Sequence, residues 1–318
     1  MKYRKGEAKQ YARQNMRGVW GASLTPFKQD YTIDEEGLRY NIRYCIDALQ
    51  MEGMFLNRLY GEAFNQTIEE RKRVMRVAVE EAKGEMAIMP YTSDSAVANV
   101  VNMTRYAEEI GADYVVIINP KFYFGSMTEE GVYRYYKYVA ENTGIGIVLF
   151  NQMEHGYLMS GKLVNRIADI ENVVAIKETA PTMEIGKTRA LCDDRIVVSE
   201  VSEDNWLGNL AIRHQEVMIA APAPFTLQSK KIKLVKEYTD LATKGEYQKA
   251  TEVCKSLETI RRTLRLATPA GKAHAALKYW TQCLGMAGGD GRVRMPLPEL
   301  TEVEKQTIET GVRETGLV

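Results

Sequence analysis

Cysteine and histidine are scarce in this sequence, and neither is arranged for metal or redox chemistry. The 318 residues include four cysteines and three histidines. They are Cys45, Cys192, Cys254, Cys283, His155, His214 and His274. No pair of cysteines has the close spacing of a zinc site or a redox motif, and the histidines lie outside HxH and HExxH spacings. We therefore expect free thiols in a reducing compartment, and neither a metal ion nor another cofactor.

The sequence also lacks an excess of charge and long hydrophobic runs. Lysine plus arginine and aspartate plus glutamate number 42 each, so the formal net charge is zero. Binding to nucleic acid or to an anionic membrane requires a basic excess, and a membrane span requires about 20 apolar residues. The basic residues 1–17 lack the apolar core of a secretory signal. We expect a cytoplasmic protein without nucleic-acid or membrane partners, and a poorly ordered arm over residues 1–17.

What the sequence does contain is a regular alternation of short apolar runs and longer amphipathic stretches. Each run has the length and β-branched content of a fully buried strand. The expected strands are 18–24, 53–57, 86–91, 113–119, 146–151, 172–177, 195–200 and 216–221. Eight strands that alternate with helices predict a closed (β/α)8 TIM barrel. A doubly wound open sheet, the alternative, usually has fewer strands and a glycine-rich first turn.

Helix signals fill the intervals and continue beyond the last strand. Apolar residues recur at helical spacing over 34–50, and Thr67 with Glu70 forms a capping box. Thr128 and Ser160 are expected to begin further helices. After residue 225 we expect helices over 227–244, 246–266 and 270–283, and a last one from Thr301. The predicted organisation is therefore an arm over 1–17, a barrel over 18–225, and a helical extension over 226–318 that packs on the barrel.

Lys177 is the most notable residue at the carboxyl ends of the strands, where barrel enzymes hold their active sites. It ends the apolar run Val-Val-Ala-Ile. A desolvated lysine favours its neutral form, and a neutral amine can attack a carbonyl carbon to form a Schiff base. The alternative is a lysine whose ammonium extends to a carboxylate such as Glu178.

Several motifs in the correct order resemble the dihydrodipicolinate synthase / N-acetylneuraminate lyase superfamily of class I aldolases. The resemblance covers residues 17–318. The matching segments are 18–27 (GVWGASLTPF), 60–62 (YGE), 175–178 (AIKE), 294–300 (RMPLPEL) and 314–318 (ETGLV). The resemblance implies a TIM barrel, Schiff-base chemistry at Lys177, a 2-oxo acid substrate, and a homo-oligomer, either a tetramer or a dimer.

The sequence departs from the family at the residues that usually surround the Schiff-base lysine. Leu59 and Tyr60 replace two adjacent hydroxyl residues that bind the substrate carboxylate in the family. Phe150 replaces the tyrosine that transfers protons. Tyr60 and Tyr123 are our candidates for that catalytic role. The candidate substrate-binding residues are Leu59, Phe150, Asn151, His155 and Trp206.

These replacements favour a substrate less polar than pyruvate plus a small aldehyde. The sequence therefore predicts a lyase, an aldolase or hydratase-aldolase, that acts on a 2-oxo acid through Lys177. One alternative keeps the imine but leads to dehydration, deamination or condensation. Another is a barrel that binds a ligand without turning it over.

Overall fold

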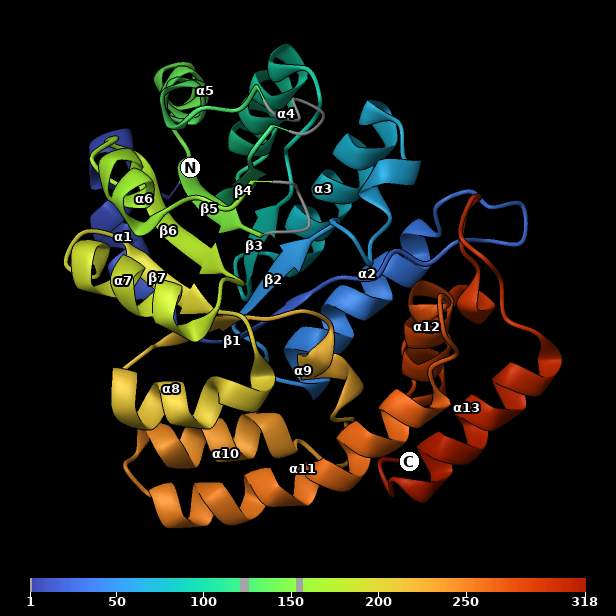
Figure 1. Cartoon of the computed structure of the whole chain (residues 1–318). Helices are drawn as coiled ribbons and strands as arrows, with labels where there is room; N and C mark the ends of the chain where they lie inside the picture. Colours follow the sequence, from blue (N-terminus) through green and yellow to red (C-terminus); the bar gives the residue numbers. More distant parts are fainter. Residues whose placement is uncertain (1, 121–125, 153–156) are drawn as a thin grey trace.

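The computed structural model describes residues 2–120, 126–152 and 157–318, and these residues form eight parallel strands. The strands are β1 (Gly18–Ala22), β2 (Gly53–Leu56), β3 (Ala87–Pro90), β4 (Tyr114–Ile118), β5 (Gly146–Asn151), β6 (Val173–Glu178), β7 (Val197–Glu200) and β8 (Val217–Ile219). Seven of them lie within the runs expected from the sequence, and β6 extends one residue beyond its run, to Glu178. Helices surround the strands, and the (β/α)8 barrel is confirmed (Figure 1).

The barrel consists of two four-stranded arcs, β3-β2-β1-β8 and β4-β5-β6-β7. At one seam, Tyr91 forms a parallel bridge with Val116. At the other, the Ser199 hydroxyl donates to the Val217 carbonyl at 3.1 Å and accepts from the Ile219 amide at 2.9 Å. A serine side chain thus takes the place of ladder bonds between β7 and β8, close to the end of β6.

The helices that follow the strands begin largely at the residues expected to cap them. They are α2 (Glu35–Arg43), the π-helix Tyr44–Ala48, α3 (Ile68–Ala82), α4 (Val97–Glu109), α5 (Glu129–Glu141), α6 (Gly161–Ile167), α7 (Thr182–Cys192), α8 (Trp206–Arg213) and α9 (Ala223–Thr226). Thr67, Thr128 and Ser160 each accept a backbone N–H of the first turn. These bonds satisfy donors that have no partner within the helix.

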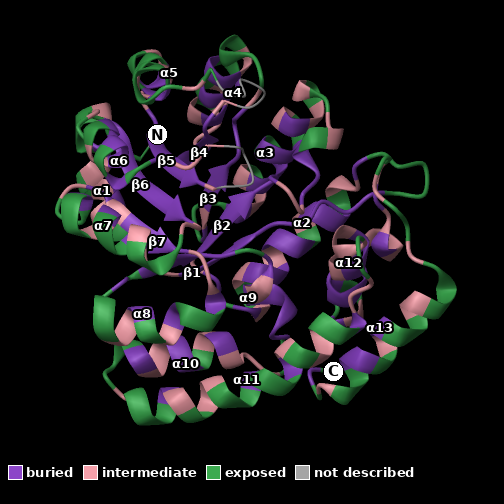
Figure 2. Cartoon of the chain, viewed as in Figure 1, coloured by how far each residue is buried: buried purple, intermediate pink, exposed green. Residues whose placement is uncertain are grey.

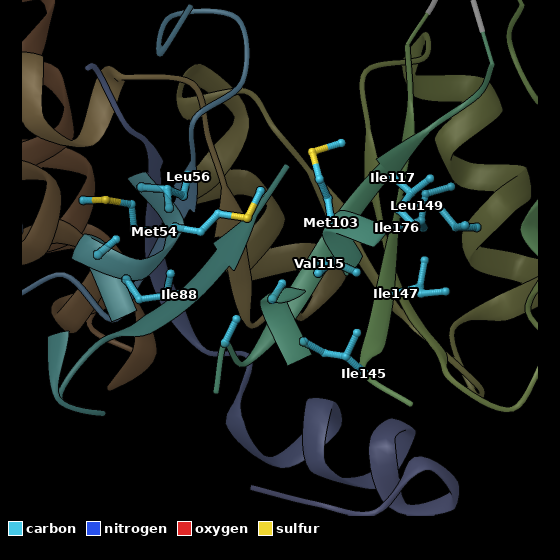
Figure 3. Close-up of a cluster of buried hydrophobic side chains, with 14 of the residues drawn as sticks. Met54, Leu56, Ile88, Met103, Val115, Ile117, Ile145, Ile147, Leu149 and Ile176 are labelled. Carbon is cyan, nitrogen blue, oxygen red and sulfur yellow. The ribbon is translucent and has the colours of Figure 1, made fainter. Parts of the chain in front are cut away.

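Strand residues alternate between two apolar layers, because successive side chains point to opposite faces. Ile147, Leu149 and Ile176 belong to the layer between the strands and the helices (Figure 3). Val148 and Phe150 face the barrel interior, together with Phe55. The strands are accordingly buried along their length, whereas the helices expose their outer faces (Figure 2).

The first residues are folded, which corrects the expectation of a poorly ordered arm. A short 3-10 helix (Lys5–Glu7) leads into α1 (Ala8–Asn15), which packs against β5 and β6. Ala8 and Ala12 are fully buried, and Tyr3 accepts a hydrogen bond from the Gly146 amide at 2.9 Å. The apolar positions of this segment therefore cover the end of the barrel where β5 begins.

The helices of the C-terminal region are α10 (Leu234–Thr243), α11 (Tyr247–Ala267), α12 (Ala273–Cys283) and α13 (Glu302–Glu314). Helix α10 contacts β1, and α12 contacts α9 (Figure 1). Lys278 of α12 is fully buried and forms an ion pair with Glu62, which lies in the loop after β2. The extension is therefore joined to the barrel mouth by buried charges as well as by apolar contacts.

Candidate active site

Lys177 lies on the interior face at the carboxyl end of β6. It is opposite Phe150 of β5 and Ser199 of β7, and only 4% of it is exposed. Its Nζ donates a hydrogen bond to the carbonyl of Ile219, at the end of β8. Among the residues that the structure describes, no carboxylate forms an ion pair with Lys177, so it does not extend to Glu178.

Two aromatic rings and a second cation surround the amine. Its Nζ is 5.0 Å from the ring centroid of Phe150 and 5.8 Å from that of Phe55. Burial, followed by the charge of Arg58, lowers the pKa of Lys177 well below its usual range. Burial disfavours the charged form, and a like charge acts in the same direction. The site therefore favours a neutral, nucleophilic amine.

Arg58 is a residue of this site that the sequence analysis did not select. It lies two residues beyond β2, and 7% of it is exposed. Its Cζ is 4.7 Å from the Phe150 ring centroid, and its Nη2 donates to the Gln152 side-chain oxygen. The side chain thus crosses from the end of β2 to the end of β5. The available signal was a charged residue directly after an apolar strand, as for Lys177.

Of the predicted substrate-binding residues that the structure describes, Phe150 is the one that lies against Lys177. Leu59 and Tyr60 lie half-buried in the loop after β2, and the Tyr60 ring packs against His274 of α12 with 5.3 Å between centroids. Tyr60 thus lies at the rim of the barrel, on the side of the helical extension. Tyr123 and His155 lie outside the described residues.

The structure does not bring Asn151 or Trp206 to Lys177. Asn151 follows the inward-facing Phe150 and pairs with Glu178, so both point outward. The Asn151 amide donates to Glu178 at 3.1 Å and to the Met159 carbonyl at 3.0 Å, and burial raises the pKa of Glu178 to about 7. Trp206 is buried in the cluster between the barrel and α10, where it donates to Thr239 at 2.9 Å.

A cavity of about 450 Å³ lies beside the mouth, at the ends of β3 and β4. The Phe64 and Tyr91 side chains line it, as do polar groups of Ser93 and Asn119. Within the described ranges, no group of three metal-ligating side chains is placed to hold an ion. No helix in this part of the chain is long and apolar enough to cross a membrane.

A buried lysine at the carboxyl end of a barrel strand is typical of lyases of the Schiff-base aldolase class. Known proteins support this assignment. A profile of the dihydrodipicolinate synthetase family matches residues 15–315, and the chain belongs to that family. It is an enzyme of the lyase class, in a superfamily of Schiff-base aldolases.

Similar proteins match over nearly the full length of the chain. It is 27% identical over 305 residues to 4-hydroxy-tetrahydrodipicolinate synthase of Acetivibrio thermocellus, which covers 95% of this chain and 98% of that one. Dihydrodipicolinate synthase of Aquifex aeolicus superposes with a TM-score of 0.82 at 24% identity, over 95% and 98% of the two chains. YagE of E. coli K12, solved in complex with pyruvate, superposes with a TM-score of 0.83 at 22% sequence identity, over 95% of this chain and 99% of that chain. At these identities the two structures show the fold alone.

Proposed function

We propose that Lys177 forms a Schiff base with a 2-oxo acid and that the enzyme cleaves or forms a bond next to the resulting imine. The observation that carries the proposal is a buried amine at the barrel mouth, between two aromatic rings, with its pKa lowered by burial and by Arg58. A buried amine without a described counter-charge destabilises the fold, which favours a role in chemistry.

The reaction begins when the neutral Nζ attacks carbon 2 of the acid. The carbonyl oxygen leaves as water, and a C=N bond that carries a proton on nitrogen takes its place. In a cleavage, the electrons of the C3–C4 bond move toward this cation to give an enamine, while the C4 hydroxyl loses its proton and becomes a carbonyl. Protonation of C3 and hydrolysis then release the acid and restore the amine. In the hydratase variant, water is added or removed next to the same imine.

The group that transfers these protons is a separate part of the proposal, since Phe150 has no exchangeable proton. Tyr60 and Tyr123 are the candidates. Tyr60 lies in the loop after β2, at the rim of the mouth, where its ring packs against His274. Leu59 and His155 stay candidates for substrate binding.

We propose a substrate less polar than pyruvate plus a small aldehyde. The rings of Phe55 and Phe150 beside the amine support an aryl or alkyl group in the second half of the substrate. Resemblance to the family supports a homo-oligomer and a cytoplasmic location, and size-exclusion chromatography with light scattering tests the first of these.

The test is reductive trapping followed by peptide mass spectrometry. The enzyme is incubated with pyruvate, phenylpyruvate or a sugar 2-oxo acid and then reduced with borohydride. We expect an adduct on Lys177 that is absent from Lys177→Ala. A folded protein that gives no adduct with any acid would favour the ligand-binding barrel instead. Efficient turnover of polar sugar acids alone would overturn the proposal of a less polar substrate.

A further inference from the structure

Arg58 and Lys177 place two cations on one aromatic ring at the mouth of the barrel. Their charged groups lie 4.7 Å and 5.0 Å from the Phe150 centroid, and both side chains are buried. The guanidinium of arginine stays charged in proteins, and taking such an ion out of water costs several kcal/mol. When Lys177 becomes a protonated imine, a second positive charge develops beside the first.

A carboxylate is the group that stabilises both charges. A 2-oxo acid carries its carboxylate one bond away from the carbon that Lys177 attacks. The guanidinium is a planar fork of donors that matches a carboxylate with two parallel hydrogen bonds. The family's usual hydroxyl pair is absent, because Leu59 and Tyr60 occupy those positions. The carboxylate therefore needs a different binding group in this chain.

We propose that Arg58 binds the carboxylate of the 2-oxo acid and selects for acids over neutral carbonyl compounds. This inference rests on the proposed function, because it assigns a binding group to the same substrate. Phe150 supports the guanidinium from below, and Gln152, whose side-chain oxygen accepts from Arg58, orients it. Arg58 is thus a specificity-determining residue of the site, supplied by the end of β2.

The second role of Arg58 follows from its position. Its charge acts against protonation of the free amine, and a substrate carboxylate bound to the guanidinium acts in the opposite direction. The bound acid therefore stabilises the protonated imine that forms next. A neutral ketone or an ester lacks this effect, even when it reacts with the same amine.

The experiment compares two probes of similar size, pyruvate and its methyl ester, in reductive trapping with cyanoborohydride. The readout is the ratio of their second-order rate constants at Lys177. Because both probes react with the same amine, a change in the amine's own reactivity cancels in this ratio. Loss of charge-assisted hydrogen bonds should lower the preference for pyruvate about 10- to 100-fold in Arg58→Met. Arg58→Lys, which keeps the charge but not the fork, should show a smaller loss.

Arg294→Met is the matched control, because Arg294 also lies over a phenylalanine, 4.6 Å from the Phe27 centroid, beside the buried Lys278. We expect it to keep the wild-type ratio. An unchanged ratio in both Arg58 variants would overturn the inference while the Schiff base at Lys177 still stood. If wild type gives no Lys177 adduct with any acid, the proposed function fails, and the inference fails with it. Arg58→Lys provides the test if Arg58→Met does not fold.

Discussion

Two buried lysines of the described residues, Lys177 and Lys278, lie in similar surroundings but differ in whether a carboxylate pairs with them. Lys177 and Arg58 lie over the ring of Phe150, while Lys278 and Arg294 lie over the ring of Phe27. The side chains of both lysines are almost wholly shielded from solvent. Burial lowers the pKa of each. Neither burial nor the aromatic contact therefore distinguishes the two.

The two lysines differ in the carboxylates around them. Lys278 forms an ion pair with Glu62 and donates to the Arg292 carbonyl at 2.9 Å, and Arg294 pairs with Glu70 at 2.6 Å. Glu62 opposes the effect of burial on the pKa of Lys278. Lys177 donates to the Ile219 carbonyl and has no ion pair with a carboxylate of the described residues, and Arg58 adds a like charge. Both lysines lie beside an arginine, so the carboxylate makes the difference: Lys278, which has one, connects parts of the fold, whereas Lys177 is prepared to react.

The largest difference is expected in chemistry. Lys177→Met should reduce imine trapping and turnover on the order of 10⁴-fold or more, because the nucleophile itself is lost. Lys278→Met, assayed at low temperature so that the protein stays folded, should keep its adduct on Lys177. Rate constants of trapping, normalised to folded protein, measure both. An adduct on Lys278 in Lys177→Met would show that Lys278 is also reactive, which would contradict the difference between the two lysines.

For the free energy of unfolding, we expect the opposite order: substitution of Lys278 should have the larger effect. Lys278→Met leaves the Glu62 carboxylate buried without its partner, which should cost about 3–5 kcal/mol in the free energy of unfolding. Lys177→Met removes an amine without a described counter-charge, so its free energy of unfolding should stay within about 1 kcal/mol of wild type, or exceed it. Urea titrations measure both. The double variant Glu62→Gln with Lys278→Met should recover part of the loss, and a failure to do so would mean that the pair is not the cause.

The barrel could be predicted from the sequence because its signals are local. Each strand is buried on both faces and reads as an apolar run, and the caps Thr67, Thr128, Ser160 and Thr301 hold their first turns as expected. The packing of α1 was missed, because its small apolar residues have a meaning only against the barrel they cover. Trp206 was misplaced for a similar reason: a single tryptophan does not indicate which cluster it joins.

The site was only partly predictable, because side-chain direction depends on more than composition. Lys177 could be found as the one charge in the expected apolar run 172–177. Asn151 could have been set aside, since Phe150 and its neighbour in a strand cannot both face inward. Arg58 could not be assigned, because its contact with Gln152 depends on the distance between the ends of β2 and β5. Arg58, the carboxylate-binding group that we propose, directly precedes the two positions where the family's hydroxyl residues are replaced.

The pH dependence of imine formation tests whether Lys177 is neutral near neutral pH. Lys177 faces Arg58, the rings of Phe55 and Phe150, and the Ile219 carbonyl, and its pKa is lowered. A base with a lowered pKa is neutral above that pKa, so between pH 7.5 and 9.5 trapping should rise far less than for an amine of ordinary pKa. An amine of ordinary pKa would gain about a hundredfold over the same two units. Such a hundredfold rise in wild type would show that Lys177 is protonated at neutral pH.

The smallest effect should come from replacing the rings of Phe150 and Phe27. The two substitutions test whether one ring contributes to catalysis and the other to stability. Phe150→Leu removes the ring that faces both Lys177 and Arg58, and a cation–π contact is worth about 0.5–2 kcal/mol. Since the ring stabilises the cationic imine, trapping should slow about 2- to 30-fold. Phe27→Leu should leave trapping unchanged and lower the free energy of unfolding by about 1 kcal/mol. Faster trapping in Phe150→Leu would mean that the ring obstructs the amine. Phe150 would then not stabilise the cationic imine.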